Sequence, residues 1–522
     1  MVIVMGNMAK TNWKKYKQLL ILPCLVYGVM HSSQAVAMSF MFFPRVTVQE
    51  TYSDNIRLAA SKDLKQSAFV TQINTGIAVQ GVRGGRATLN LDYNLQTLFN
   101  AGGDGSTSIF HQLSLNGNYR VTRNRLNVSV RSNISQQNTS NIRIGDNLNN
   151  LNTRTNVYSV GVSPVWTPHF GSFADAIVRV DFDYLANKNF NSGVNDATNG
   201  LLDSINVSES VQLRSGRDFQ RITWLVNFNN SDSFRFNDVN SGFQNTSAIV
   251  RAWVDRRFNF FATVGYANNK FANLNPNTNG VSYTVGGQWI PSRFFNIEAG
   301  YGNNWHVTAN LNPTRFTHIG VGYFDRSKGL NTGGAWNAVI THRTRQSFWS
   351  LTYTEDTTTN QRSLLDGTSP PDAPPSFTND IFSRKNVNAS VSYQTGKSTV
   401  QAGGFYQRRE FFNVDAQLEQ VYGANASWRW QFIRRSNLFV SSSYSHINRS
   451  ATSVIAASTD DRYEGLVRLT RTLPLAWGRV TTTLNTSLEY RYVKQLSNLV
   501  INNIQSNSFT ENRVTLSLSL FY

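Results

Sequence analysis

Residues 87–96, ATLNLDYNLQ, decide the fold, because apolar and polar side chains alternate along them without a break. The apolar positions are Leu89, Leu91, Tyr93 and Leu95, and the polar ones are Asn90, Asp92, Asn94 and Gln96. Successive side chains of a strand point to opposite faces of its sheet. The segment is therefore predicted to be a β-strand with one apolar face and one polar face.

The same alternation recurs along the chain in stretches of about ten residues, the length of a membrane-crossing strand. Residues 480–492, VTTTLNTSLEYRY, and residues 514–522, VTLSLSLFY, repeat it, and no helical periodicity follows residue 37. Two architectures give this pattern. A soluble sandwich turns the apolar faces into a core, and a membrane barrel turns them toward lipid. Three features favour the barrel.

The first feature is the presence of charged residues in the middle of strands, on their polar faces, where a water-filled lumen accommodates them. The residues expected to face the lumen are Asp92, Arg131, Arg179, Asp181, Asp183, Arg221, Arg251, Glu298, Arg429, Arg468, Glu489 and Arg491. Asp181 and Asp183 share one strand with Arg179, and paired carboxylates can serve acid–base chemistry. We prefer the interpretation that these charges form a ladder balanced by arginines on neighbouring strands.

The second feature is a set of large aromatic residues at strand ends near short turns, as in an interfacial girdle. They are Trp166, Phe170, Phe173, Trp289, Phe294, Phe295, Phe348, Trp349, Trp430, Phe432 and Trp477. The third is the final strand, which resembles the carboxy-terminal signal that the outer-membrane assembly machinery reads. Its outward positions are Val514, Leu516, Leu518, Leu520 and Tyr522. We therefore predict an all-β transmembrane antiparallel barrel in the outer membrane of a Gram-negative bacterium.

Residues 1–37 have the features of a cleaved signal peptide. Four lysines precede the mostly apolar run Leu19–Met30, which is shorter than the ~20 residues of a membrane helix. Cleavage after Ala37 leaves residues 38–522 as the barrel. The single cysteine, Cys24, lies in the signal, so the mature chain has no cysteine chemistry. A lipoprotein site at Cys24 is the alternative, and the proline before it disfavours that site.

Short turns alternate with longer polar segments, so the chain is expected to run up and down with both termini in the periplasm. Counting from the turns predicts about 24 strands, with 22 to 26 accepted. They are expected to begin near residues 43, 67, 86, 108, 125, 155, 173, 201, 219, 245, 258, 281, 294, 304, 316, 334, 347, 381, 397, 420, 437, 460, 477 and 509. The boundaries between 304 and 343 are the least distinct. The longest loop, Asp356–Asp380, is the best candidate to fold into the lumen.

Because strand-like sequence begins by Phe43, no plug domain is expected ahead of the barrel, which argues against a TonB-dependent transporter. The net charge of +18 falls to about +14 without the four signal lysines. Most short turns carry arginine or lysine. Such a ring can attract an anionic cargo, or it can anchor the turns at anionic headgroups, and we prefer the second interpretation. The location argues against a nucleic-acid partner.

No residue pattern indicates an active site, a metal or a cofactor. The six mature histidines are scattered without metal-ligand spacing; they are His111, His169, His306, His318, His342 and His446. No nucleophile elbow, phosphate loop or dinucleotide fingerprint occurs. We therefore expect no enzymatic activity and no bound cofactor.

Three stretches resemble the exosortase/PEP-CTERM system-associated outer-membrane protein family. They are Val46–Leu98 with its ETYSDNI, His111–Asn138 with its final SQQN, and Thr341–Asp356 with its HRTR. The resemblance extends over essentially the whole mature chain. It implies an outer-membrane barrel associated with exopolysaccharide production and surface-protein sorting, and it carries over no functional residue.

These features leave three functions open. The chain can be a pore or export channel serving exopolysaccharide or sorted proteins. It can be a structural or docking barrel that retains such material at the surface without transport. An outer-membrane hydrolase would need an acid–base cluster on the lumen wall and has no positive support. The expected partners are outer-membrane lipid, the barrel assembly machinery, and acidic exopolysaccharide or surface-sorted proteins.

Overall fold

A computed structural model of the chain shows one antiparallel sheet that closes on itself as a barrel of 24 strands. A further element of the sheet, β7 (His169–Phe170), is a two-residue piece that pairs with the start of β8. The structure describes residues 38–521 except 101–106, 124, 139–144, 150–153, 190–202, 237–239, 271–277, 360–361, 364–380, 413–416, 452–456, 478–479, 499, 502–504 and 507. The predicted signal peptide and the last predicted assembly residue, Tyr522, lie outside these residues and stay predictions.

Each strand of the barrel pairs with its neighbours in the sequence, as in an up-and-down barrel. The strands are β1 (Ser39–Ser53), β2 (Ala68–Arg83), β3 (Ala87–Asn100), β4 (Thr107–Thr122), β5 (Leu126–Asn138), β6 (Arg154–Trp166), β8 (Ala174–Asn189), β9 (Ser204–Ser215), β10 (Ile222–Arg235), β11 (Ser241–Trp253), β12 (Phe258–Lys270), β13 (Gly280–Ser292), β14 (Phe295–Gly302), β15 (Asn304–Thr314), β16 (Thr317–Arg326), β17 (Gly333–Arg343), β18 (Ser347–Thr359), β19 (Ile381–Gln394), β20 (Ser398–Phe411), β21 (Leu418–Ile433), β22 (Ser436–Arg449), β23 (Ser458–Trp477), β24 (Val480–Ser497) and β27 (Phe509–Phe521).

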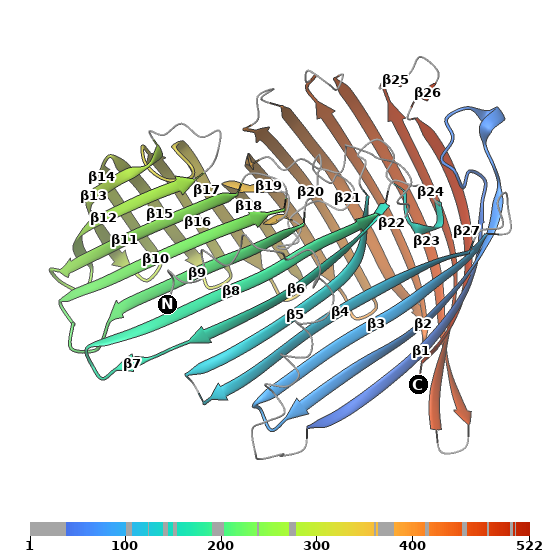
Figure 1. Ribbon diagram of the computed structural model, residues 1–522, viewed down its shortest axis with the longest axis horizontal. Coiled ribbons are helices and arrows are strands. Elements are labelled where there is room, and N and C mark those ends of the chain that lie inside the picture. The colour runs from blue at the N-terminus through green and yellow to red at the C-terminus, as the bar shows by residue number, and fades with distance from the viewer. Residues whose placement is uncertain are drawn as a thin grey trace.

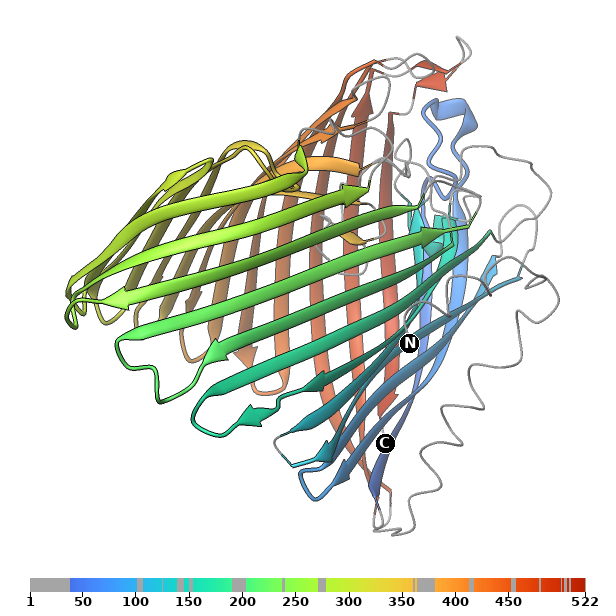
Figure 2. The same ribbon diagram turned by 60° about the vertical axis from the view of Figure 1, so that its left-hand side comes forward.

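The barrel closes where the first strand meets the last. β1 pairs with β2 on one side and with β27 on the other, from Arg45 opposite Phe521 to Ser53 opposite Arg513. Figures 1 and 2 show this seam between the blue and red ends of the chain. Closure matters because an open sheet edge in lipid leaves N–H and C=O groups unpaired, at several kcal/mol each.

The sequence-based strand count is confirmed, and every predicted start lies within about four residues of the observed one. The least distinct region was also placed correctly, with β15, β16, β17 and β18 beginning at 304, 317, 333 and 347. Two details differ. Arg221 lies in the turn before β10 rather than within a strand, and Asp356 belongs to β18, which runs on to Thr359. Among the described residues, no helix has the length and apolar character needed to cross a bilayer.

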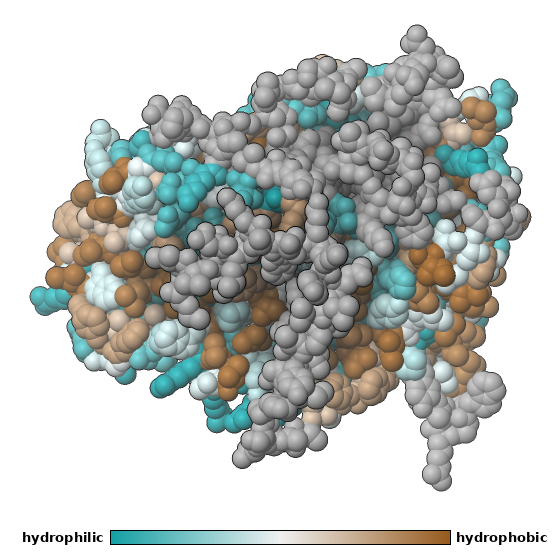
Figure 3. Space-filling view, viewed as in Figure 1, coloured by the Kyte–Doolittle hydropathy of each residue, from teal (hydrophilic) through white to brown (hydrophobic). Residues whose placement is uncertain are grey.

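The two faces of the wall differ in chemistry. Large apolar side chains on one face are exposed to the surroundings, as at Val264, Val285, Leu488 and Leu516. In Figure 3, hydrophobic residues cover much of the visible surface at the left and lower right, and many hydrophilic residues lie above them. An exposed apolar area of this extent on a soluble protein would be exceptional. This face contacts lipid.

Exposed aromatic residues flank the apolar face at both ends of the strands. Near the short turns they are Trp166, Phe170, Phe173, Trp289, Phe294, Phe348, Trp349 and Trp430. Near the longer connections they include Tyr52, Phe69, Phe99, Tyr406, Tyr422 and Tyr463. Two such belts mark the two membrane–water interfaces of a barrel. Trp477, another residue predicted for the girdle, ends β23, and its side chain lies outside the described part.

The wall is lower on the side opposite the seam, at the left of Figure 1. β14 has 8 residues and β23 has 20. β14 and β15 are joined through Asn303 alone, and glycines bring β13 and β14 close together. A Cβ at Gly286 would overlap the carbonyl oxygen of Ala299, and one at Gly302 would overlap that of Tyr283. Only glycine fits where the two backbones approach this closely.

Candidate functional site

The polar face of the wall, which carries most of the predicted lumen residues, is crossed by arginine–carboxylate pairs. Nη2 of Arg131 on β5 lies 2.5 Å from Oδ2 of Asp183 on β8, and Nη1 lies 3.8 Å from Oδ1 of Asp181. Nε of Arg179 is 2.8 Å from Oδ2 of Asp181. Gly161 of β6 lies between β5 and β8, opposite both Arg131 and Asp183. The glycine leaves room for the two side chains to meet over it.

The same arrangement occurs near the seam. Nη1 and Nη2 of Arg45 on β1 lie 2.8 and 2.6 Å from the two carboxylate oxygens of Asp92 on β3. The guanidinium passes over Gly76 of the intervening strand β2. A bidentate arginine–carboxylate pair fixes geometry as well as charge. The carboxylates of Asp92, Asp181 and Asp183 are therefore each paired with an arginine side chain.

A row of rings and charges covers the polar face of the lower wall. Phe261 of β12 is buried, and His306 stacks on it at 5.6 Å between ring centroids. Arg251 lies over Phe261 and also contacts Glu298, with Nη1 2.8 Å from Oε2. Nε2 of His306 lies 3.1 Å from Oε1 of the same glutamate. The row combines ring stacking with one shared carboxylate.

The remaining predicted lumen residues fall into two groups. Arg468 pairs with Glu489 across β23 and β24, and Nε of Arg491 lies 2.8 Å from Oε1 of Glu464. Arg429 instead lies over the ring of Phe439, 5.8 Å from its centroid. Arg221 sits exposed in its turn. Sequence reasoning placed most of these residues on one face, but it did not pair them.

Sequence reasoning missed a buried charge row at the loop ends of β20 to β23. Nη1 of Arg409 lies 3.0 Å from Oε2 of Glu419, and both side chains are 1% exposed. Nε of Arg449 lies 3.6 Å from Oε1 of Glu419, and Nη1 of Arg449 also binds Asp460. These residues have the same parity as the polar positions of their strands, so continuing the alternation to the strand ends would have found them.

A short segment between β5 and β6, residues 145–149, reaches the strands on both sides of the seam; we call it the bridging segment. Oδ2 of Asp146 lies 2.5 Å from Nη1 of Arg513 on β27 and 3.1 Å from Nη1 of Arg491 on β24. Nδ2 of Asn147 donates to Oε1 of Gln96 on β3 at 2.6 Å. The segment therefore spans the polar face from β3 to β24.

Two further contacts hold the bridging segment at the seam. Asn149, which is buried, donates from Nδ2 to the carbonyl oxygen of Ile56 and to Oε1 of Glu511, at 3.2 Å each. Leu148 packs against an apolar cluster that includes Val70 and Leu98. The sequence-based candidate for an inward loop was Asp356–Asp380, most of which lies outside the described residues. Of that loop, Nη1 of Arg362 lies 3.3 Å from Oγ of Ser231 on β10.

The arrangement gives no support to an acid–base pair for catalysis. Asp181 and Asp183 are bound by Arg131 and Arg179, so neither carboxylate is free of an ion-pair partner. Glu298 is bound by Arg251 and His306. Within the described part of the chain, no three His, Cys, Asp or Glu side chains converge to hold a metal ion. The expectation of no enzymatic activity stays a prediction.

No protein-family model matches the chain. A search of curated proteins also finds no match. The family resemblance seen in the sequence therefore stays a prediction.

Solved structures similar to this chain share little of its sequence. The siderophore receptor PirA from Acinetobacter baumannii is 9% identical over 92% of this chain and 80% of its own, with a TM-score of 0.45. PirA from Pseudomonas aeruginosa is 10% identical with the same coverage and a TM-score of 0.40. OpdK from Pseudomonas aeruginosa, solved with vanillate, is 9% identical over 92% of this chain and 99% of its own, with a TM-score of 0.33.

Proposed function

We propose that the chain is an outer-membrane channel whose polar face lines a water-filled lumen. The closed ring of 24 strands with opposite chemistry on its two faces supports this proposal. Barrels of ~16–18 strands already enclose an aqueous channel, and diameter grows with strand number. A ring of this size encloses more space than one layer of side chains fills.

The proposed orientation follows from the apolar face. Because that face contacts lipid, residues of the other parity point inward, including Asp92, Arg131, Arg251 and Glu489. The short turns are proposed to lie in the periplasm and the longer connections outside. The described ends of the chain, at residues 38 and 521, lie at the short-turn end of the wall, where Ser39 pairs with Val82.

The proposed cargo is an exopolysaccharide or a surface-sorted protein, as the family resemblance implies. Exposed arginines at the short turns, such as Arg217, Arg256 and Arg345, support an attraction of anionic material to that mouth. Other turn arginines support membrane anchoring instead. Arg315 lies over the ring of Phe316 at 4.6 Å from its centroid, where an aromatic belt meets headgroups.

Conductance of the purified full-length mature barrel in planar lipid bilayers tests the channel. We expect discrete current steps with weak ion selectivity, because many of the charges of the polar face are already paired with opposite charges. Absence of steps from a correctly folded barrel would overturn the channel function.

The alternative is a docking barrel that retains polysaccharide or sorted proteins at the cell surface. Its sequence support is the long proline-containing loop, residues 360–380. Replacing residues 364–380 by a short glycine–serine linker separates the two functions. Loss of surface retention with unchanged conductance would favour docking by this loop, whereas unchanged retention would contradict that version.

A further inference from the structure

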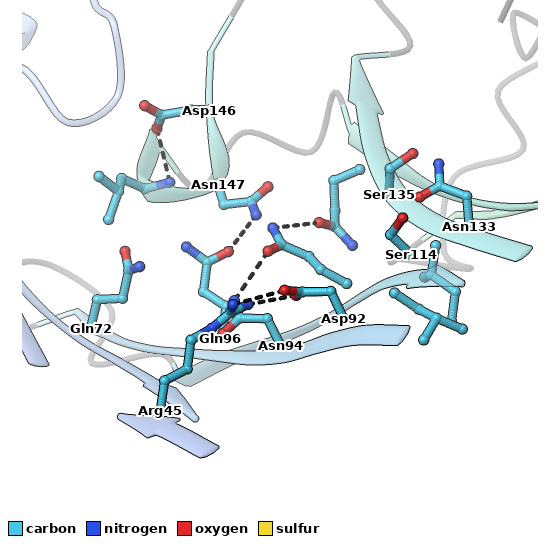
Figure 4. Close-up of a pocket in the computed structure, with 15 residues that line it drawn as sticks. Arg45, Gln72, Asp92, Asn94, Gln96, Ser114, Asn133, Ser135, Asp146 and Asn147 are labelled. Carbon is cyan, nitrogen blue, oxygen red and sulfur yellow. Dashed lines mark hydrogen bonds and ion pairs between the residues drawn. The ribbon is translucent and has the colours of Figure 1, made fainter. Parts of the chain in front are cut away.

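The bridging segment roofs a cavity of about 480 Å³ against the polar face of β1 to β5. This volume lies within the ~300–1,000 Å³ of small-molecule sites. Figure 4 shows Asp146 and Asn147 above the strand residues that form the floor. Amide side chains dominate the lining, at Gln72, Asn94, Gln96, Gln112, Gln136 and Asn147.

The amides already form a connected hydrogen-bond network. Nδ2 of Asn94 donates to Oε1 of Gln112 at 3.1 Å, and Nε2 of Gln112 donates to Oε1 of Gln136 at 3.3 Å. Asn147 donates to Gln96. Each amide has two donor hydrogens and an acceptor oxygen, so the network retains capacity for further bonds. Oδ1 of Asn147 is buried and has no hydrogen-bond partner among the described residues.

The charges of the lining are compensated. Its arginine, Arg45, is bound to Asp92 through both guanidinium nitrogens. Its other carboxylate, Asp146, is bound to Arg491 and Arg513. An anionic group in this cavity would meet two carboxylates and an arginine that is already paired. An uncharged solute pays no such electrostatic penalty.

Residues of apolar type also border the cavity. Leu113, Ile134 and Leu148 take part in the lining beside the amides. A sugar ring has the matching chemistry, because its hydroxyl groups both donate and accept hydrogen bonds and its C–H groups are apolar. Amides read such hydroxyls in either orientation, which charged groups alone cannot do.

We propose that this cavity is a binding subsite for an uncharged sugar segment of an oligosaccharide or polysaccharide. The inference deepens the proposed channel function, on which it rests, by naming the class of solute that the wall contacts. The bridging segment is then a positioning element, which presents Asn147 from above while the strands present their amides from below.

Isothermal titration of the folded barrel in detergent tests the subsite without requiring conduction. The probes are three neutral hexasaccharides, maltohexaose, cellohexaose and mannohexaose, and one acidic one, hexagalacturonate. We expect saturable binding of at least one neutral probe that is tighter than binding of the acidic probe. No saturable binding of any neutral probe, or tighter binding of the acidic one, would overturn the subsite.

Three variants identify the site. Gln96→Leu with Gln112→Leu removes two wall amides, and Asn147→Ala removes the one amide of the bridging segment that lines the cavity, without altering a strand. Each of these two changes should weaken binding of the neutral probe about tenfold, which is the effect of losing one or two hydrogen bonds. The matched control is Gln212→Leu on β9, whose amide donates to Asn227 at 3.2 Å away from this cavity. An equal loss in the control would overturn the assignment.

The two proposals fail separately. Current steps from a barrel that binds no neutral probe would support the proposed channel and contradict the proposed sugar subsite. Binding that depends on Asn147 in a barrel without current steps would keep the sugar site and remove the channel.

Discussion

Asp146 and Arg513 are 367 residues apart in the sequence, yet Nη1 of Arg513 lies 2.5 Å from Oδ2 of Asp146. The pair joins the bridging segment to the last strand of the barrel, which is also the strand that closes the ring against β1. Arg513 is buried and is shared with Glu511, whose Oε1 lies 2.7 Å from its Nε. One carboxylate from a loop thus completes a charge cluster at the seam.

Asp146→Asn should loosen the bridging segment. The change removes the charge that Arg491 and Arg513 share, so we expect a loss of about 1–3 kcal/mol in stability and larger single-channel currents. Urea unfolding in detergent and bilayer recordings measure the two effects. Asp63→Asn, in the exposed turn Lys62–Leu64, is the control and should change neither. A variant identical to the wild type in both measurements would show that the bridging segment neither stabilises the barrel nor restricts current through it.

Two adjacent arginines of β20 allow a comparison of buried and exposed ion pairs on one strand. Arg409 pairs with Glu419 at 1% exposure each, whereas Arg408 pairs with Glu410 at 40% and 44%. Glu419→Gln should destabilise the barrel by about 3–5 kcal/mol, because it leaves a buried guanidinium without its charge partner. Glu410→Gln should cost only about 0–1 kcal/mol. Thermal unfolding, followed by the mobility shift of the folded barrel in gels, measures both, and equal costs would contradict the assigned burial.

The strands could be predicted because their evidence is local. In Ala87–Asn100 the alternation of apolar and polar residues shows which face of the sheet each side chain occupies, and turn residues mark both ends. The parity rule also put Arg131 and Asp183 on one face. What the rule could not supply was the partner of each charge, since pairing depends on which strands lie two apart and on where a glycine such as Gly161 leaves room.

The bridging segment could not be predicted for a different reason. Residues 145–149 read GDNLN, which is ordinary loop composition, and their contacts include Gln96, Arg491 and Arg513. Nothing near residue 146 in the sequence marks those distant strands. Loop length favoured the longer segment 356–380 as the loop that folds inward. Residues 145–149 are instead held against the wall by specific ion pairs and hydrogen bonds, which do not depend on loop length.

The close approach of β13 and β14 predicts a strict requirement for glycine. Gly286→Ala would place a Cβ against the carbonyl oxygen of Ala299, a backbone atom that can move only with its strand. We expect a loss of about 1–3 kcal/mol, the usual cost of overpacking, and a lower yield of folded barrel. Gly465→Ala on β23 is the matched control, since a Cβ there meets nothing within 4 Å. Equal yields for the two variants would show that the strands can separate at this point.

The final strand offers a direct test of which face meets lipid. Leu516 and Thr515 are adjacent on β27; Leu516 lies on the apolar face, opposite Leu488, and Thr515 lies opposite Glu489. Leu516→Arg would place a cation among acyl chains, at a cost of about 2–4 kcal/mol near the bilayer midplane. Thr515→Arg would place the same side chain beside the Glu489 carboxylate on the polar face, where it should be tolerated. Assembly in cells and unfolding in lipid vesicles measure the difference. If Thr515→Arg proved the more damaging change, the polar face would have to be the one in contact with lipid, and the channel would lose its lumen.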